Sequence, residues 1–289
     1  MCDAIQKLKF YCFRTVEDAC PYDYEGTVSF LLSHIKHTDK SKFETIIKFI
    51  EKGKIMNEIK IMGLQKVTLL DFPGKVACTV FFGGCNLRCP FCHNASLVLD
   101  RGGEPVMTEE AFFSLLSKRR GGLDGVCVTG GEPLLQPELP RFIAEIRALG
   151  YAVKLDTNGT MPDRLSALLA EKAVDYVAMD IKSSPEDYEA ACGLPVDVEK
   201  IKRSIALIKE SGIPHEFRTT VVSGLHTEED ILEAARLVGD SPYFLQSFVD
   251  SGDLIGQETA AFGAFSPDEM RAMCEKARLS APNCQVRGV

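Results

Sequence analysis

Residues 75–94 read Lys-Val-Ala-Cys-Thr-Val-Phe-Phe-Gly-Gly-Cys-Asn-Leu-Arg-Cys-Pro-Phe-Cys-His-Asn. An apolar run ends at two glycines, and three cysteines follow at Cys85, Cys89 and Cys92. Thiolates this close together repel one another, so they are usually oxidised or held by a shared cation. The spacing C-x3-C-x2-C supplies three soft ligands without a local fourth, unlike the cysteine run of bacterial-type ferredoxins. Three thiolates on a four-iron cluster leave one iron open, which suits a cluster that binds a substrate and carries an electron.

Two simpler interpretations of the cysteine triplet remain open. His93 could complete a zinc site, although the adjacent side chains of Cys92 and His93 would point in different directions. A buried free cysteine is the usual role of a single Cys, and it explains Cys78 and Cys127 better than it explains the triplet. The spacing therefore favours a metal–sulfur cluster.

The composition predicts a chain that buries a large core and works in a reducing compartment. Of the 289 residues, 45% are apolar, which is enough for one large α/β domain with an appendage or for two domains. A formal net charge of −8 disfavours a nucleic-acid partner, because phosphate backbones require a basic surface. Eleven irregularly spaced cysteines, no signal peptide and no long apolar segment predict a cytoplasmic protein without a membrane partner.

Residues 1–58 differ in pattern from the rest of the chain. Their apolar residues have helical spacing in two stretches, 27–36 and 42–52, with a polar segment between them. We expect a small helical N-terminal extension of unknown role, followed by the main domain at residues 59–289.

From residue 63 onward, apolar β-branched runs alternate with helical stretches. This order, with short connections, predicts a parallel sheet with right-handed crossovers. Six strand–helix units are too few for a closed eight-stranded barrel, so we expect an α/β fold with an open, partial (βα)6 barrel of the TIM type. The expected strands are 76–82, 125–129, 151–155, 174–181, 216–222 and 243–249. The expected helices are 108–119, 137–149, 162–172, 197–211, 227–238 and 266–279.

Most of the chemically distinctive residues lie at or near the ends of these strands. The C-terminal ends of parallel strands meet on one rim, where α/β proteins assemble their sites. One such placement would mean little, but it recurs along the chain. The residues are the cysteine triplet after the first strand, Gly130, Gly131 and Glu132 after the second, Asp156 after the third, Asp180 and Lys182 at the fourth, Arg218 in the fifth and Gln246 in the sixth.

Gly130-Gly131-Glu132-Pro133 is a second candidate binding segment. The glycines let backbone carbonyls approach a ligand closely, Glu132 adds a carboxylate, and Pro133 fixes the turn. A set of acceptors alone suits a cation such as an α-ammonium group. On its own, the same sequence is also typical of an ordinary turn.

Five further residues could contact a ligand at the rim. Asp156 and Asp180 could bind ribose hydroxyls or a monovalent cation, but helix capping or a salt bridge explains them equally well. Lys182 and Arg218 could meet a carboxylate, or they could be solvated surface charges. Phe91, between two of the cysteines, could face an adenine or pack in the core.

The cysteine triplet and the Gly-Gly-Glu-Pro segment resemble the cluster loop and the methionine-binding motif of radical S-adenosylmethionine (SAM) enzymes. Residues 63–75, Gly-Leu-Gln-Lys-Val-Thr-Leu-Leu-Asp-Phe-Pro-Gly-Lys, are similar to the opening of glycyl-radical-enzyme activating proteins. The resemblance is closest to activators of anaerobic ribonucleoside-triphosphate reductase, with pyruvate formate-lyase activase as a near relative. It covers roughly residues 60–285.

The resemblance implies a [4Fe–4S] cluster and a SAM molecule bound at the rim, with no other catalytic side chain, because the cofactors carry the chemistry. It also implies reductive cleavage of SAM, with an electron from flavodoxin or ferredoxin, to generate a glycyl radical on the reductase. Residues 95–124 contain no cysteine, so a single cluster is expected. The residues so implied are Cys85, Cys89 and Cys92 for the cluster and Phe91, Gly130, Gly131, Glu132, Asp156, Lys182, Arg218 and Gln246 for SAM.

Other functions remain open from the sequence. The chain could activate pyruvate formate-lyase or another glycyl radical enzyme, or transform a small molecule, as carboxy-deazaguanine synthase does. An iron–sulfur electron carrier or a zinc-binding module would have the cysteines without a SAM site. A cluster spectrum that responds to SAM would exclude both.

Overall fold

The computed structural model describes residues 59–289 except 100–102, 251, 253 and 257–260. The helical extension expected at residues 1–58 lies outside the described residues, and the domain boundary expected at 58/59 stays a prediction. The following account therefore concerns the main domain.

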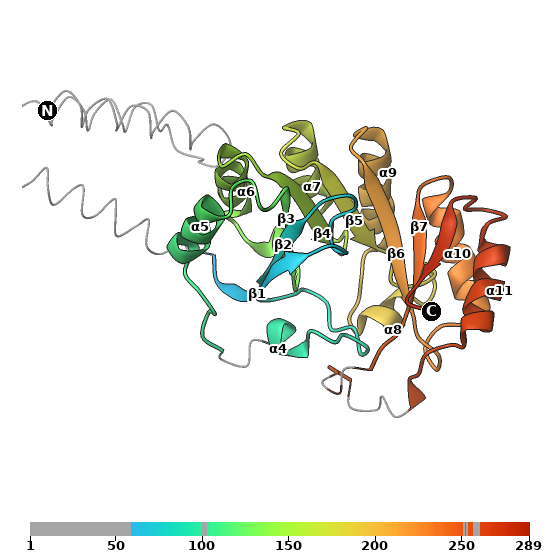
Figure 1. Cartoon of the computed structure of the whole chain (residues 1–289). Helices are drawn as coiled ribbons and strands as arrows, with labels where there is room; N and C mark the ends of the chain where they lie inside the picture. Colours follow the sequence, from blue (N-terminus) through green and yellow to red (C-terminus); the bar gives the residue numbers. More distant parts are fainter. Residues whose placement is uncertain (1–58, 100–102, 251, 253, 257–260) are drawn as a thin grey trace, which may run out of the picture. The chain divides into compact units, whose positions relative to one another are not determined.

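One mixed sheet forms the centre of this domain (Figure 1). Within the described residues it has eight strands, hydrogen-bonded in sequence order from β1 to β8. β1 is antiparallel to β2, and the pairs from β2 to β8 are parallel. The strands are β1 (Ile61–Thr68), β2 (Ala77–Phe82), β3 (Gly125–Gly130), β4 (Ala152–Thr157), β5 (Tyr176–Asp180), β6 (His215–Val221), β7 (Tyr243–Ser247) and β8 (Cys284–Arg287).

The longer helices connect successive strands and lie along the outside of the curved sheet in Figure 1. The short helices α4 and α8 follow the C-terminal ends of β2 and β5, on the side where the site is expected. The helices are α4 (Ala95–Val98), α5 (Glu109–Lys118), the 3-10 helix η1 (Pro133–Leu135), α6 (Leu139–Ala148), α7 (Pro162–Ala170), α8 (Tyr188–Cys192), α9 (Val198–Glu210), α10 (Glu228–Val238) and α11 (Pro267–Ala277).

The expected partial barrel is confirmed, and each of the six expected strands and six expected helices is present with its ends within two residues. Local chemistry at the helix starts explains part of this agreement. Thr227 with Asp230, and Ser266 with Glu269, form reciprocal capping boxes at α10 and α11. Each side-chain cap satisfies a backbone N–H that would otherwise lack a partner, and such a cap typically contributes about 1 kcal/mol.

The sheet is wider than the six strands expected, because β1 and β8 add one strand at each edge. β1 contains a glycine and three consecutive exposed residues, Gln65, Lys66 and Val67, and its register with β2 shifts twice, so it lacks a regular alternation. β8 has only four residues. Because β1 and β8 are the two edges of the sheet, the barrel is open on one side.

An ion pair inside the barrel links β8 to β6. Glu216 is 2% exposed, and both of its carboxylate oxygens accept hydrogen bonds from the guanidinium of Arg287, at 3.1 and 2.7 Å. The same guanidinium lies 3.3 Å from the ring centroid of Phe244. A bidentate pair of this kind is stronger than a neutral hydrogen bond, and it compensates a carboxylate that would otherwise be buried alone.

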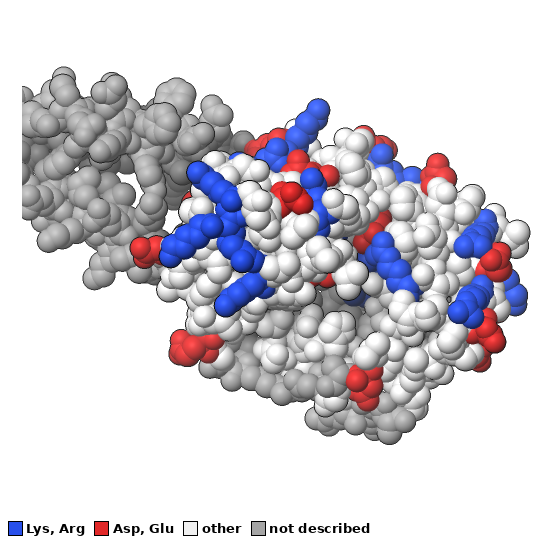
Figure 2. All heavy atoms as spheres, viewed as in Figure 1, with Lys and Arg blue, Asp and Glu red and all other residues white. Residues whose placement is uncertain are grey.

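Two properties of the described residues bear on possible partners. No helix in the described ranges is long and apolar enough to cross a bilayer. On the face that Figure 2 shows, Lys and Arg side chains gather on one part and mix with Asp and Glu elsewhere.

Candidate active site

A cavity of about 460 Å³ opens at the C-terminal ends of the strands, within the size range of small-molecule sites. It brings together ten of the eleven residues that the sequence predicted for the site. Glu132 is the exception, since it does not line the cavity. The ten are Cys85, Cys89, Cys92, Phe91, Gly130, Gly131, Asp156, Lys182, Arg218 and Gln246.

The loop that carries the cysteines is fixed by backbone hydrogen bonds to its neighbours. Gly84 N donates to Leu97 O at 2.8 Å, which anchors the loop to α4. Arg88 N donates to Cys192 O at 2.8 Å, at the C-terminal end of α8. The loop is therefore held from two sides before any metal binds.

Two donors also reach the sulfur of Cys85. The backbone N–H of Leu87 lies 3.4 Å from this sulfur, and the side-chain amide of Asn158 lies 3.8 Å from it. The same amide donates to Asn86 Oδ1 at 3.0 Å. Hydrogen bonds to a sulfur that ligates a cluster tune the reduction potential of the cluster. Asn158 therefore belongs to the candidate site although the sequence analysis did not single it out, and Asn86 helps to hold its amide in place.

The three thiols differ in electrostatic environment. Burial raises the pKa of Cys85 to about 11 and also raises the pKa of Cys92. A hydrogen bond with Cys192 lowers the pKa of Cys89, and the positive charge of Lys182 lowers it further against the effect of burial. Because metals bind thiolates, loading the site must release protons, and Cys89 ionises most readily of the three.

Gly130 and Gly131 are required by close packing of two strand ends. Gly130 has φ +132°, and a Cβ there would lie 2.2 Å from the backbone of Phe82. A Cβ on Gly131 would lie 1.9 Å from Gly84 O. This contact allows Gly131 N to donate to Phe82 O at 3.0 Å, so the end of β3 supports the start of the cysteine loop.

Glu132 points into the protein instead of toward the cavity. It is 0% exposed, and its carboxylate accepts hydrogen bonds from Leu134 N at 3.0 Å, Thr157 Oγ1 at 2.9 Å and Asn158 N at 2.7 Å. Burial raises its pKa to about 7, and these three donors partly offset the shift. Direct contact between Glu132 and SAM stays a prediction, whereas its link from the β3 turn to the end of β4 is present in the structure.

Asp156 and Asp180 lie in a chain of opposite charges across the rim. Arg218 donates from Nη1 to Asp156 at 3.1 Å and from Nε to Asp180 at 2.9 Å. Lys182 Nζ donates to the other oxygen of Asp180 at 3.1 Å, and the buried Lys154 forms an ion pair with Asp156. Although burial opposes both charges, this pairing lowers the pKa of Asp180 and raises that of Lys182. The salt-bridge alternative for these acids is therefore present in the structure.

The remaining predicted residues lie as follows. Phe91 is 5% exposed and meets the ring of His226 edge-on at 6.0 Å, so it packs in the core and also borders the cavity. His226 is a satisfied buried histidine, because Val222 N donates to its Nδ1 and its Nε2 donates to Lys182 O at 2.7 Å. It thereby holds the backbone that carries Lys182. Gln246 lines the cavity from β7.

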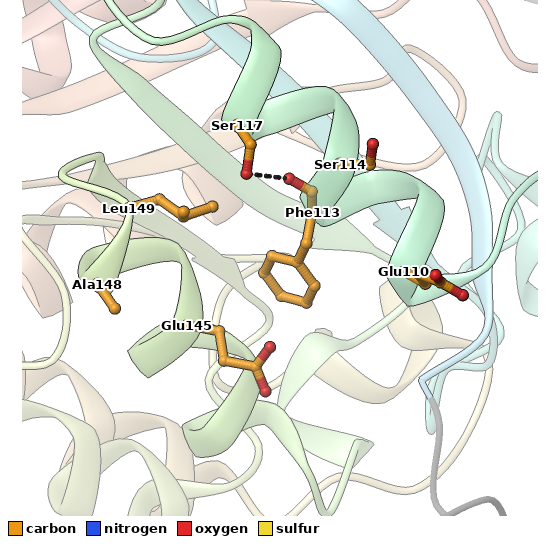
Figure 3. Close-up of a pocket in the computed structure, with 7 residues that line it drawn as sticks. All are labelled: Glu110, Phe113, Ser114, Ser117, Glu145, Ala148 and Leu149. Carbon is orange, nitrogen blue, oxygen red and sulfur yellow. Dashed lines mark hydrogen bonds between the residues drawn. The ribbon is translucent and has the colours of Figure 1, made fainter.

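A second hollow lies between α5 and α6 on the outer surface (Figure 3) and shares no lining residue with the rim cavity. Phe113 points into it, toward Leu149 and Glu145. The hydroxyl of Ser117 donates to the carbonyl of Phe113 within the same helix, at 2.9 Å. The hydroxyl of Ser117 is therefore already paired within α5.

In the described part of the chain, no three His, Cys, Asp or Glu side chains converge closely enough to hold a single metal ion. A cubane cluster requires a wider arrangement than a single metal ion does, because each cysteine binds a different iron and the thiols are spaced around the cluster. The three cysteines are unbonded and line one cavity, so they fit such a cluster.

Comparison with known families identifies the fold and its cofactors. A family model described as the radical SAM superfamily matches residues 79–238. The chain belongs to that superfamily. Radical SAM proteins bind a [4Fe–4S] cluster and SAM, and Cys85, Cys89 and Cys92 are the cysteines that would hold the cluster here. When bound, the cluster supplies a low-potential electron for cleavage of SAM.

This radical SAM protein is similar to several proteins with assigned functions. It is 32% identical over 237 residues to a protein of Methanocaldococcus jannaschii assigned as a glycyl-radical enzyme activating enzyme, a match that spans 79% of this chain and 96% of that protein. It is 36% identical over 137 residues to the pyruvate formate-lyase-activating enzyme of Clostridium pasteurianum, 44% of this chain and 54% of the relative. It is 38% identical over 160 residues to the 7-carboxy-7-deazaguanine synthase of Hyperthermus butylicus, 50% of this chain and 67% of the relative.

Replacing Cys89 by alanine should prevent assembly of the cluster, because one of its three ligands is lost. After anaerobic reconstitution, the variant should lack the brown chromophore and bind little iron and sulfide. Cys78→Ala is the matched control, since Cys78 is a buried β2 cysteine that does not line the cavity. A complete [4Fe–4S] spectrum in the Cys89 variant would remove the assignment.

Gly131→Ala should destabilise the metal-free protein by about 1–3 kcal/mol or more, because the added methyl group meets backbone that cannot give way. Urea unfolding measures this change. Gly122→Ala is the control, since a Cβ there would lie an ordinary 3.5 Å from its nearest neighbour. Equal stability of the two variants would contradict the packing argument.

Glu132 should give the folded protein a measurable pH dependence. Because its pKa is about 7 when folded and near 4.5 when unfolded, the stability that it contributes is present below pH 4.5 and is lost as the pH rises to about 7. The difference in unfolding free energy between wild type and Glu132→Gln should therefore fall by about 1–3 kcal/mol between about pH 5 and about pH 8. Glu171→Gln, at an exposed position, controls for removal of one carboxylate, and the same pH dependence in wild type and the Glu132 variant would refute the assignment.

Proposed function

We propose that this protein activates a glycyl radical enzyme, and that its partner is an anaerobic ribonucleotide reductase. In this proposal the protein cleaves SAM reductively and removes a hydrogen atom from one glycine of the partner. The observation that carries the activating role is the match over 96% of the relative assigned as an activating enzyme. The choice of a reductase as partner rests on the resemblance of residues 63–75 to the opening of reductase activators.

The open side of the barrel supports a protein substrate. β1 and β8 form two separate edges of the sheet, so the barrel interior is not enclosed by strands on that side. The cavity is lined from Gln65 on β1 across the barrel to Gln246 on β7. An extended loop of a partner enzyme, with its glycine at the tip, could therefore reach the cavity between the edges.

The chain's own residues provide binding and shielding in this proposal. Lys182 and Arg218 present positive charge at the rim, which suits the carboxylate of SAM. Phe91 presents an apolar side chain beside the cysteines, which helps to keep water from the cleaved sulfonium. The cofactors carry the bond cleavage, and these side chains orient SAM for it.

The electron donor and the compartment follow from the same proposal. A low-potential cluster needs a low-potential donor, and we expect a flavodoxin or ferredoxin. The eight cysteines of the described residues are all unbonded, which suits the reducing cytoplasm. An anaerobic setting follows from the sensitivity of glycyl radicals and exposed clusters to oxygen.

The test is anaerobic incubation of the reconstituted protein with SAM, a reductant and a purified anaerobic ribonucleotide reductase. We expect a glycyl radical signal in electron paramagnetic resonance (EPR), and one 5′-deoxyadenosine for each radical. With a partner whose glycine is replaced by alanine, the signal should be absent. SAM cleavage without a radical on the reductase would reject this partner, and a radical on pyruvate formate-lyase instead would reassign it.

A second candidate is small-molecule chemistry, which the match to 7-carboxy-7-deazaguanine synthase favours. That match spans half of this chain, whereas the match to the activating enzyme spans 79%. Turnover of a free pterin-like or purine-like substrate, with no radical on any glycyl radical enzyme, would support this second function.

A further inference from the structure

Lys154 is a buried charge that no motif in the sequence explains. It lies in the middle of β4, and its side chain is 1% exposed. Lysine is almost never buried to this extent without a partner. Its ammonium group forms an ion pair with Asp156 Oδ1. Two further contacts are weaker interactions, with the sulfur of Cys127 at 3.9 Å and with the ring of Tyr176, whose centroid is 6.0 Å away.

The two rim carboxylates have no oxygen left without a cationic partner. Asp156 receives Lys154 on one oxygen and Arg218 on the other. Asp180 receives Arg218 on one oxygen and Lys182 on the other. Three positive and two negative side chains therefore alternate across β4, β5 and β6, and the set carries one surplus positive charge.

We propose that Lys154 is a built-in counterion of the SAM site: it positions Asp156 at the cavity wall and takes the place that a dissolved monovalent cation would occupy beside Asp156. The sequence alone left a cation at these two acids open. Here the lysine supplies that charge covalently, so SAM binding should not depend on added sodium or potassium. The inference rests on the SAM site and is independent of which partner enzyme is activated.

The route for a substitute cation is present. Asp156 and Asp180 both line the cavity, which opens at the rim, so an ion from solvent could reach them if the ammonium were removed. Lys154→Met keeps an unbranched apolar chain of similar length and removes only the charge. The variant thus leaves one oxygen of Asp156 free for an ion from the buffer.

The first measurement needs no variant. The affinity of the anaerobic, cluster-loaded wild-type protein for SAM should agree within about twofold in sodium, potassium and choline buffers of equal ionic strength, because the charges are internal. A marked loss of SAM affinity in choline, by about tenfold or more, would overturn the proposal.

The second measurement uses Lys154→Met. Its affinity for SAM in choline should fall by about tenfold or more, the size of effect seen when the outer partner of a ligating group is removed. Sodium, potassium or ammonium should restore much of this loss, and Lys154→Arg should retain the wild-type behaviour. Unchanged affinity in Lys154→Met, or a loss that no cation restores, would refute the role of the lysine as counterion.

A third measurement separates this role from a purely structural one. In metal-free protein, sodium or potassium should raise the melting temperature of Lys154→Met relative to choline, and should not do so in wild type. Lys202→Met, which removes a lysine paired with Glu199 on the surface, should behave as wild type. If Lys154→Met does not fold, the double variant Lys154→Met/Asp156→Asn removes the uncompensated charge. It should then bind SAM weakly with no response to cations, and a cation response there would contradict the proposal.

Discussion

The site depends on the backbone contact between the ends of β2 and β3. At Gly131 the chain passes so close to Gly84 that no side chain fits between them, and the strand ends are joined by the hydrogen bond from Gly131 N to Phe82 O. The next residue, Glu132, turns inward and gathers donors from the end of β4. The buried carboxylate thus links the turn after β3 to the end of β4, and the backbone of Gly131 links β3 to β2. The cysteine loop takes its position from these three strand ends. The Gly-Gly-Glu-Pro segment therefore has a structural role in the site, in addition to the ligand contact predicted for it.

The second organising principle is a balance of charges inside an open barrel. Acidic and basic side chains alternate from β4 to β6, and Asp156 and Asp180 are each compensated by a lysine close by in sequence and by Arg218 of β6. Buried charges are costly unless they are paired, so the strands cannot separate without exposing unbalanced groups. The same network leaves positive charge at the cavity wall, where an anionic part of a ligand is expected. Stability and ligand preference therefore come from one set of contacts.

Much of this arrangement could be predicted from the sequence, and the rest could not for physical reasons. Periodicity predicted the six strand–helix units, because local patterns determine them. Cysteine spacing predicted Cys85, Cys89 and Cys92 as candidate cluster ligands, and the three line one cavity. The edge strands β1 and β8 were missed because one is irregular in register and the other is very short. The inward direction of Glu132 was not predictable, since it depends on donors that follow β4. The buried ion pair of Lys154 could not be predicted for a similar reason. Its partner Asp156 lies two residues away in sequence, but the burial of the lysine depends on the surrounding strands.

The pair between Arg287 and Glu216 gives the last strand an importance beyond its length. A four-residue edge strand makes few ladder hydrogen bonds and would ordinarily fray. Here fraying of β8 would withdraw the guanidinium of Arg287 from the almost completely buried carboxylate of Glu216. Fraying would therefore leave a buried charge without its partner, which costs free energy. The Arg287–Glu216 pair therefore keeps β8 in place beside the open side of the barrel, so that this boundary keeps a defined shape.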